Sequence, residues 1–272
     1  MLYLIATPIG NLEDITLRAL RLLREVDLIA AEDTRHSKIL LQHYDINTPL
    51  ISLHSFNETQ RTPQLLARLK QGENIALITD AGTPLISDPG YGLVKAVRIV
   101  GIQVIPLPGA CAAITALCAS GLPTDRFVFE GFFPAKSSER KKHLASLQHE
   151  TRTSIFYEAP HRIVECVENI VSVLGADREI VLAKELTKTF ETFFCGTAGE
   201  ALQWLEVDVN HTRGEFVVLI SGMVELKKSE ISENTLHILK ILSEELPHSQ
   251  AVELTARITG EKKNALKKSC FL

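Results

Sequence analysis

Short apolar runs alternate with stretches of helical spacing over about residues 1–110, and this alternation constrains the fold more than any other feature of the sequence. The runs span residues 2–6, 26–31, 49–53, 74–79 and 102–107, and each ends at turn or polar residues. Between them, leucines recur at helical spacing, as at Leu17, Leu20 and Leu23. Buried strands that alternate with helices form mainly parallel sheets. We therefore expect an α/β fold for this part of the chain.

The second half of the chain has a different pattern. It contains strand candidates at 127–131, 153–157, 179–183, 190–195 and 215–220, with helices near 138–148, 160–173 and 197–205. Two strands follow each other closely around Leu186–Phe190, which predicts an antiparallel pair. After Ser221-Gly222 the composition changes to helix formers, with helices expected at about 231–245, 248–258 and 261–269. We expect a mixed α+β region followed by a small helical extension.

We place the boundary between the α/β region and the mixed α+β region at a segment with glycine and proline. Alanines between Gly109 and Ala119 predict a helix packed closely on the first sheet, and Gly121-Leu122-Pro123 ends it. We therefore predict three domains. They are a mainly parallel α/β domain (1–119), a mixed α+β domain (120–223) and a helical extension with helix-turn-helix spacing (224–272).

Composition narrows the class of protein. The net charge of -4 over 272 residues argues against general attraction to nucleic acid or anionic membrane, so a polyanion site must be a local patch. Five cysteines without a CxxC pair fit a reducing cytoplasm and indicate neither a disulfide framework nor a metal site. No stretch approaches the roughly 18 apolar residues of a membrane span. The segment Arg257–Lys268 carries five basic residues and one acid, which reads either as a solvated helix face or as a phosphate-contacting patch.

One loop is much richer in turn residues than a simple connection requires. Asp80–Gly90 holds two glycines, two prolines and two aspartates in eleven residues, so its backbone is either shaped around a ligand or an elaborate structural turn. The loop Thr7–Leu12 matches neither of the glycine-rich phosphate-binding motifs, which disfavours nucleotide di- and triphosphates. Because ligands of parallel sheets bind at the carboxyl ends of strands, we expect a small-molecule site there.

Charged residues follow several predicted strands. Each is either one member of a surface ion pair or part of a site. They are Glu32, Asp33, Arg35, Glu158, His161, Lys184, Glu185, Glu191 and Glu215. Arg35, Arg162 and Lys184 are also candidates for contacts to RNA phosphates.

Taken in order, these loops and charged segments resemble one family over about residues 2–222. The chain is similar to the tetrapyrrole methylase superfamily of S-adenosylmethionine enzymes, and within it to the bacterial branch that methylates small-subunit ribosomal RNA. The matching segments are Ala6–Asp14, Ala31–Arg35, Asp80–Gly90, Pro108-Gly109-Ala110, Ser120–Pro123, Glu130–Pro134, Tyr157–Arg162, Lys184–Lys188, Glu191 and Gly214-Glu215. Cys111 departs from the pattern, since a serine or another small residue is expected near Pro108-Gly109-Ala110; a thiol is small enough to keep a backbone contact.

The resemblance implies a two-domain fold that holds S-adenosylmethionine between the domains. It implies methyl transfer to the ribose 2′-oxygen of a cytidine in the decoding region of 16S rRNA, by a cytoplasmic homodimer without a metal. The RNA partner that the resemblance implies is 16S rRNA in the small ribosomal subunit or in an assembly intermediate. In-line transfer from a sulfonium needs positioning and desolvation more than a metal, which agrees with this chemistry.

Residue roles follow from the same resemblance. We predict that the methyl donor contacts Pro8, Asp80, Ala81, Gly82, Thr83, Pro84, Pro108, Gly109 and Ala112. We predict RNA contacts at Asp33, Arg35, Arg162, Lys262, Lys263, Lys267 and Lys268. At the reacting centre we expect Lys184, Glu185 and Glu158, because a cation lowers the pKa of the 2′-hydroxyl and a carboxylate can accept its proton.

Two alternatives stay open. The first is a methyltransferase for a tetrapyrrole or another small molecule; that branch typically opens with a GxGPG-like loop, whereas this chain has Thr7-Pro8-Ile9-Gly10-Asn11. The second is a non-catalytic RNA-binding or cofactor-binding module that has kept the fold and lost the chemistry.

Overall fold

The first half of the chain is a parallel sheet covered by helices on both faces. The computed structural model describes residues 1–223 and 232–268, and the strand order of this sheet is β3-β2-β4-β1-β5. The strands are β1 (Leu2–Leu4), β2 (Leu28–Ala31), β3 (Leu50–Ser52), β4 (Ile75–Ile78) and β5 (Val104–Pro106). Strands β2 and β4 are buried along their whole length and contain only apolar residues, as strands covered on both faces require. The predicted α/β fold is confirmed.

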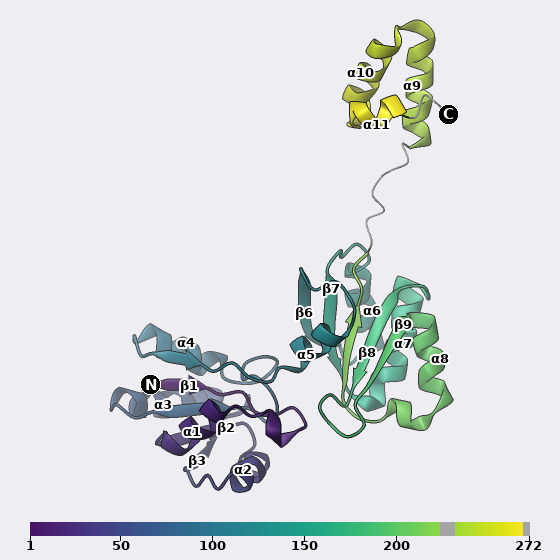
Figure 1. Ribbon diagram of the computed structural model, residues 1–272. Helices are drawn as coiled ribbons and strands as arrows, with labels where there is room; N and C mark the ends of the chain where they lie inside the picture. The colour runs from purple at the N-terminus through teal and green to yellow at the C-terminus, as the bar shows by residue number, and fades with distance from the viewer. Residues whose placement is uncertain (224–231, 269–272) are drawn as a thin grey trace. The chain divides into compact units, whose positions relative to one another are not determined.

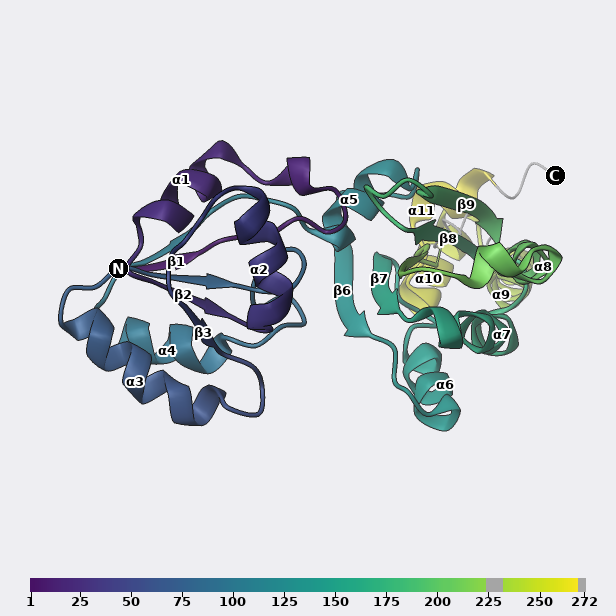
Figure 2. The same ribbon diagram turned by 90° about the horizontal axis from the view of Figure 1, so that it is seen from below.

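Two helices cover each face of this sheet (Figure 2). Helices α1 (Leu17–Glu25) and α2 (Thr34–His43) lie on one face, where Leu23 packs in one cluster with Ile29. Helices α3 (Glu58–Lys70) and α4 (Tyr91–Ile99) lie on the other, where Leu65 packs in one cluster with Leu77. All five strands run in the same direction, so the loops that follow β1, β2, β4 and β5 meet at one edge.

The second sheet is mixed, as the close succession of two predicted strands indicated. Its order is β6-β7-β10-β8-β9, with β6 and β7 parallel and the other pairs antiparallel. The strands are β6 (Phe127–Phe132), β7 (Thr153–Glu158), β8 (Glu179–Lys184), β9 (Thr192–Thr197) and β10 (Phe216–Ile220). Helices α6 (Ser137–Ser146), α7 (Ile163–Leu174) and α8 (Ala198–Val207) stand beside it (Figure 1), and α7 and α8 contribute to the core cluster on one face. Short 3₁₀ turns occur at Leu12–Asp14, Pro160–Arg162 and Val209–Thr212.

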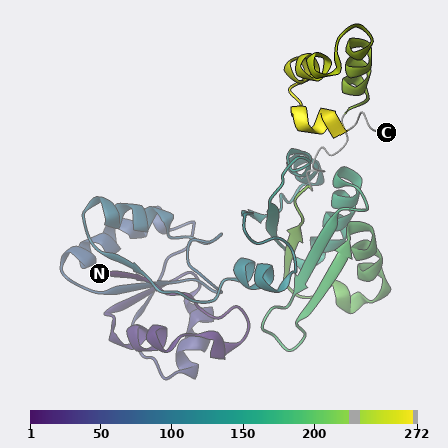
Figure 3. The same ribbon diagram turned by 45° about the horizontal axis from the view of Figure 1, so that its top comes forward.

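Helix α5 (Ala112–Ala119) covers the other face of the second sheet, so the expectation that it packs on the first sheet is wrong. Its Ala113, Ala116 and Leu117 are buried in one cluster with Val181 and Val217. Small side chains allow the helix to approach a sheet closely, but they do not specify which sheet. The three ribbon views agree that α5 lies between the two halves (Figures 1, 2 and 3).

The described residues of the C-terminal part, 232–268, form three helices. The chain divides into two compact units, Met1–Met223 and Val224–Leu272, and the second contains α9 (Glu233–Glu245), α10 (His248–Thr259) and α11 (Lys263–Lys268). Its small core consists of Leu239, Ala251, Val252 and Leu266. The Ser232 side chain caps α9. Across residues 1–223 and 232–268, no helix is long and apolar enough to cross a membrane.

Candidate functional site

A cavity of about 430 Å³ opens where the two halves of the first unit meet. We call it the first cavity. The first half contributes Ile9, Glu32, Asp80, Ala81, Gly82, Thr83, Ile86, Ser87, Asp88, Cys111 and Ala112. The second half contributes Phe132, Tyr157, Glu158, Ala159, Pro160, Ala183, Leu186, Glu215, Phe216 and Val217. The lining therefore combines the carboxyl ends of β2 and β4 with the ends of β7, β8 and β10.

The loop that joins β4 to α4 forms one wall, in a conformation that few side chains adopt. The backbone angle φ is positive at Gly82 (83°) and Gly90 (125°), and also at Leu85 (73°) and Ser87 (71°). Thr7 and Gly82 exchange backbone hydrogen bonds of 2.9 and 3.0 Å, which tie the loop to the end of β1. Positive φ at a leucine and a serine is costly and clusters at ligand sites, so this loop is held in shape by its surroundings.

Three carboxylates line the same wall. The pKa of Asp88 is raised to about 6, mainly by burial and to a smaller extent by the carboxylates of Glu32 and Asp80, while a hydrogen bond with Thr79 opposes the rise. The hydroxyl of Thr79 donates to Glu32 at 2.8 Å, and the amide of Asp33 donates to Asp80 at 3.1 Å. At neutral pH this wall is negative, so it favours a ligand that carries positive charge or hydroxyl donors.

The opposite wall is aromatic and apolar. The Tyr157 ring lies edge-on to Phe129 and Phe132, with centroid distances of 5.0 and 5.4 Å. Its hydroxyl accepts a hydrogen bond of 3.2 Å from the Ala113 amide, and burial raises its pKa, so the phenol stays neutral. Phe132 is 55% exposed. An exposed aromatic ring that lines a cavity can contact a flat ligand ring.

A second cavity of about 300 Å³ adjoins the first, because Ile9, Asp80, Ala81 and Glu215 line both. The other residues that line it are Thr7, Pro8, Gly10, Leu12, His36, Ser37, Ile39, Leu40, Thr79 and Lys188. Of the residues expected at the methyl donor, Pro8 therefore lines the second cavity, whereas Asp80–Thr83 and Ala112 line the first. Among the described residues, Pro84, Pro108 and Gly109 lie outside both linings.

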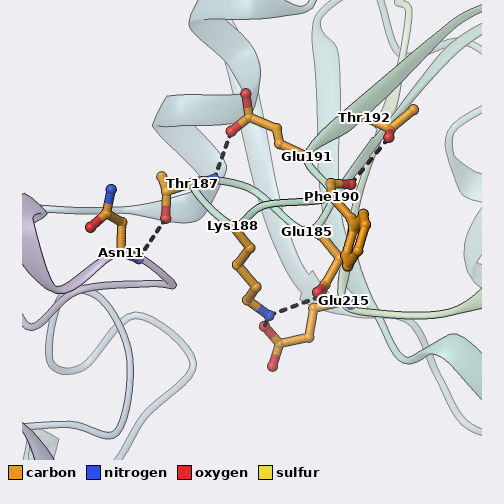
Figure 4. A network of polar contacts seen from close by, with 8 residues as sticks. All are labelled: Asn11, Glu185, Thr187, Lys188, Phe190, Glu191, Thr192 and Glu215. Carbon is orange, nitrogen blue, oxygen red and sulfur yellow. Dashed lines mark hydrogen bonds and ion pairs between the residues drawn. The ribbon is translucent and has the colours of Figure 1, made fainter.

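The loop between β8 and β9 connects the two halves beside these cavities (Figure 4). Lys188 Nζ lies 2.8 Å from Glu185 Oε1 and 2.9 Å from Glu215 Oε2. Burial raises the pKa of Glu185, but hydrogen bonds from Lys188 and from the Glu215 amide outweigh it and leave the pKa below its usual value. The Asn11 amide donates to the Thr187 hydroxyl at 3.0 Å. A Cβ on Gly10 would lie 2.6 Å from Lys188 Cγ, so glycine permits this close contact.

Two of the three residues expected at the reacting centre are buried on the side of the second sheet that α7 and α8 cover. Glu158 and Lys184 both lie opposite Phe216 in the strand register, and Phe216 packs in the core cluster of α7 and α8. Glu158 is 2% exposed and Lys184 is 6% exposed. Glu158 Oε1 pairs with Arg162 at 2.5 Å, and Oε2 lies 3.6 Å from Arg140. Glu185 is the member of the three that belongs to the loop network.

The residues expected to contact RNA are scattered over the structure. Arg35 is paired with Asp33 at 2.9 Å; hydrogen bonds from Arg35 lower the pKa of Asp33 to about 2. Arg162 is engaged with Glu158. In the C-terminal unit Lys262 and Lys267 are exposed, and Lys263 Nζ lies 2.8 Å from Glu253. The side chain of Lys268 lies outside the described part of the structure.

Sequence reasoning gave no specific role to four residues that the structure brings to the cavities: Asp88, Phe132, Lys188 and Glu215, of which Glu215 was named only as a charged residue at a strand end. All four lie in or next to segments that carried the resemblance, which is the signal that can find them. These residues come together only when the two halves pack against each other, so no local sequence pattern predicts that they are close in space. Within residues 1–223 and 232–268, no group of three or more His, Cys, Asp or Glu residues is arranged to hold a metal ion.

Comparison with family models gives two matches. Residues 1–202 match the tetrapyrrole (corrin/porphyrin) methylases, and residues 229–266 match a C-terminal helix-turn-helix domain described as that of RsmI. The first match covers the first sheet, strands β6 to β9 of the second sheet, and the lining of both cavities except Glu215, Phe216 and Val217.

Relatives with named functions cover nearly the whole chain. Two proteins named "Ribosomal RNA small subunit methyltransferase I", from Pasteurella multocida and Escherichia coli O157:H7, are each 54% identical to it. The alignments cover 98% of this chain and 95% and 93% of the two relatives. A protein of the same name from Pseudomonas aeruginosa is 52% identical and covers 97% of this chain and 94% of its own length.

Solved structures with the same fold are more distant in sequence. The methyltransferase CobJ superposes with a TM-score of 0.61 at 17% identity and covers 82% of this chain and 94% of its own. A uroporphyrin-III C-methyltransferase from Thermus thermophilus, crystallised with S-adenosyl homocysteine, gives 0.52 at 19% identity and covers 82% and 97%. At such identities the likeness concerns the fold alone.

Proposed function

The chain belongs to the tetrapyrrole (corrin/porphyrin) methylases and to their ribosomal RNA small subunit methyltransferase I group, and we propose that it transfers a methyl group from S-adenosylmethionine to 16S rRNA. More finely, we propose that the acceptor is the ribose 2′-oxygen of a cytidine in the decoding region. The observation that carries the proposal is the first cavity, in which an acidic wall from one half faces an aromatic wall from the other.

The residues of the first cavity fit S-adenosylmethionine. The exposed Phe132 ring, against which Tyr157 packs edge-on, offers an apolar face to the adenine ring, and the carboxylates of Glu32, Asp80 and Asp88 favour the positive charge and the ribose hydroxyls. When bound, the donor supplies a methyl group on a sulfonium that carries its own leaving group. The chain therefore has to hold, orient and dehydrate the reacting groups.

We propose that the acceptor ribose approaches through the second cavity, which shares four lining residues with the first. Glu185, at the end of β8, is our candidate for the carboxylate nearest the 2′-hydroxyl. Lys184, whose charge lowers the pKa of Glu185, is our candidate for the cation, although it is buried on the α7 and α8 side of the sheet and lines neither cavity. A carboxylate at that place accepts the hydroxyl proton, and a nearby ammonium stabilises the charge that develops on the oxygen. Lys188 and Glu215 line this cavity, and hydrogen bonds from the Lys188 ammonium and the Glu215 amide to Glu185 keep the pKa of that carboxyl below its usual value.

RNA contacts complete the proposal. Asp33 and Arg35 lie at the start of α2, close to the second cavity residue His36, and would meet the nucleotide from the first half. Helix α11 and the residue before it supply Lys262, Lys263, Lys267 and Lys268 for phosphate contacts. We propose a homodimer that acts in the cytoplasm on the small ribosomal subunit or on an assembly intermediate.

Incubation with methyl-labelled donor tests the substrate class. The purified protein is given either 30S particles or porphyrinoid precursors, and we expect label in RNA only. Label on the small molecule alone would reject the proposal in favour of the tetrapyrrole alternative. Binding of S-adenosylhomocysteine together with no label in any substrate would support the non-catalytic module.

A further inference from the structure

An arginine with no contact to solvent lies behind the aromatic wall of the first cavity. Arg140, on α6, has a side chain that is 0% exposed. Its Nη2 lies 2.8 Å from Glu165 Oε2 on α7, and its Nη1 lies 3.6 Å from Glu158 Oε2 on β7. Removing a guanidinium from water costs several kilocalories per mole, and a buried ion pair seldom recovers more than this cost. Stability alone therefore gives a poor account of Arg140.

Glu158 connects this arginine to the cavity. Its Oε1 forms an ion pair with Arg162 and accepts a hydrogen bond, at 2.8 Å, from the amide of Ala159, the next residue along the chain. Its Oε2 has no hydrogen-bond partner among the described atoms, and Arg140 is the cation that faces it. The carboxylate thus fixes the backbone at the end of β7 from behind, and Arg140 holds the oxygen that nothing else restrains.

The segment that Glu158 fixes is part of the cavity wall. Successive residues of a strand point to opposite faces, so Tyr157 points to the cavity while Glu158 points to the helices. Ala159 and Pro160 continue the lining directly after the strand. A shift of Glu158 would therefore move the Tyr157 ring and the Ala159–Pro160 corner together.

We propose that Arg140 and Glu158 are positioning residues that set the Tyr157–Pro160 wall for the methyl donor. This inference rests on the proposed function in one respect, namely that the first cavity is the donor site. In this proposal Glu158 does not contact the ribose. It orders the backbone at the end of β7, and Arg140 and Arg162 hold its carboxylate.

The test measures binding of S-adenosylhomocysteine by calorimetry, well below the unfolding temperature of each variant. We expect Arg140→Met to weaken binding by roughly tenfold or more, since small misplacements of a binding wall cost that much. Arg140→Lys, which keeps the charge, should recover part of the affinity. Glu158→Gln keeps the shape and should weaken binding in the same direction, which covers the case that Arg140→Met does not fold.

A matched control separates positioning from general loss of stability. Leu205→Ala opens space in the core cluster that also contains Phe156 and Phe216, at a residue that lines neither cavity. We expect this variant to unfold at a lower temperature and to bind S-adenosylhomocysteine as the wild type does. Unchanged affinity in folded Arg140→Met and Glu158→Gln, or an equal loss in Leu205→Ala, would overturn the inference.

The outcome is independent of the RNA reaction. A wild type that binds S-adenosylhomocysteine but leaves rRNA unmodified contradicts the proposed function and leaves the positioning role intact. A wild type that methylates rRNA, with variants of unchanged affinity, contradicts the positioning role alone.

Discussion

Asp88 gives the first cavity a group that titrates close to neutral pH. Its pKa is raised to about 6, first of all by burial, above the value of about 3.9 of a free aspartate. The folded chain therefore binds this proton more tightly than the unfolded chain, and the contribution of Asp88 to stability falls as the pH rises from about 4 to about 6. A cationic ligand prefers the ionised carboxylate, so its affinity changes in the opposite direction.

We predict that the affinity for S-adenosylmethionine rises with pH until Asp88 is ionised, by up to about tenfold per pH unit below its pKa. Calorimetric titrations between pH 5 and 7.5 measure this dependence. S-adenosylhomocysteine, whose sulfur is uncharged, should show a weaker dependence, and Asp88→Asn should remove it. A pH profile that is identical in wild type and Asp88→Asn would show that another group is responsible.

Gly82 tests the shape of the β4–α4 loop. Its φ is 83°, and a Cβ there would lie 3.3 Å from Ile9 Cγ2, a side chain of the cavity wall. We predict that Gly82→Val abolishes donor binding and leaves the fold intact. Gly72 offers a matched control, because it also has a positive φ (95°) and has nothing within 4 Å of an added Cβ. Gly72→Val should carry similar backbone strain and bind donor normally. Equal donor binding by both variants would show that the β4–α4 loop is not part of the donor site.

Substitution of Lys184 tests whether a cation assists the methyl transfer. If its ammonium stabilises the developing alkoxide, Lys184→Met should slow single-turnover methylation by about 10²–10⁴-fold at saturating donor and RNA. Its burial beside Phe216 allows a purely structural role, which predicts lower stability with near-normal turnover in the folded enzyme. Rates within a few-fold of wild type would therefore contradict the catalytic role of Lys184.

For the helices and strands, hydrophobic periodicity predicts which elements form better than it predicts which elements they pack against. Strands β1 to β5 lie within the five apolar runs, because a strand buried on both faces leaves a continuous apolar signature. The strand β9 begins at Thr192, two residues later than predicted, since a polar loop held by Lys188 occupies Glu185–Glu191. Helix α5 was assigned to the wrong sheet, because an apolar helix can cover either.

The C-terminal helices carry the electrostatic prediction. Replacing Lys262, Lys263, Lys267 and Lys268 with glutamine removes four positive charges. If all four contact phosphate, the slope of log affinity for RNA against log salt concentration should shrink by roughly 3–4. Lys263 must exchange its contact with Glu253 for one with phosphate, so its share should be the smallest. The control is donor binding, which should not change. An unchanged salt slope would show that these lysines form a solvated surface and do not contact phosphate.

At the scale of the whole molecule, the site depends on contacts that no single segment encodes. The Asp80–Gly90 loop is recognisable by its composition, whereas Phe132, Lys188 and Glu215 reach the cavities only because the second half folds against the first. The raised pKa of Asp88 likewise requires burial and the carboxylate of Glu32, which lies far away in sequence. Sequence patterns therefore indicated where a ligand binds, and the structure supplies the walls and their charges.

The central claim is that this chain methylates one ribose of small-subunit rRNA. Mass-spectrometric mapping of 16S rRNA, from cells with and without the protein, tests it most directly. We predict one cytidine in the decoding region that carries a 2′-O-methyl group only when the protein is present. This cytidine should regain the methyl group when the protein and S-adenosylmethionine are supplied to 30S particles. Identical ribose methylation of the two rRNA samples would contradict it.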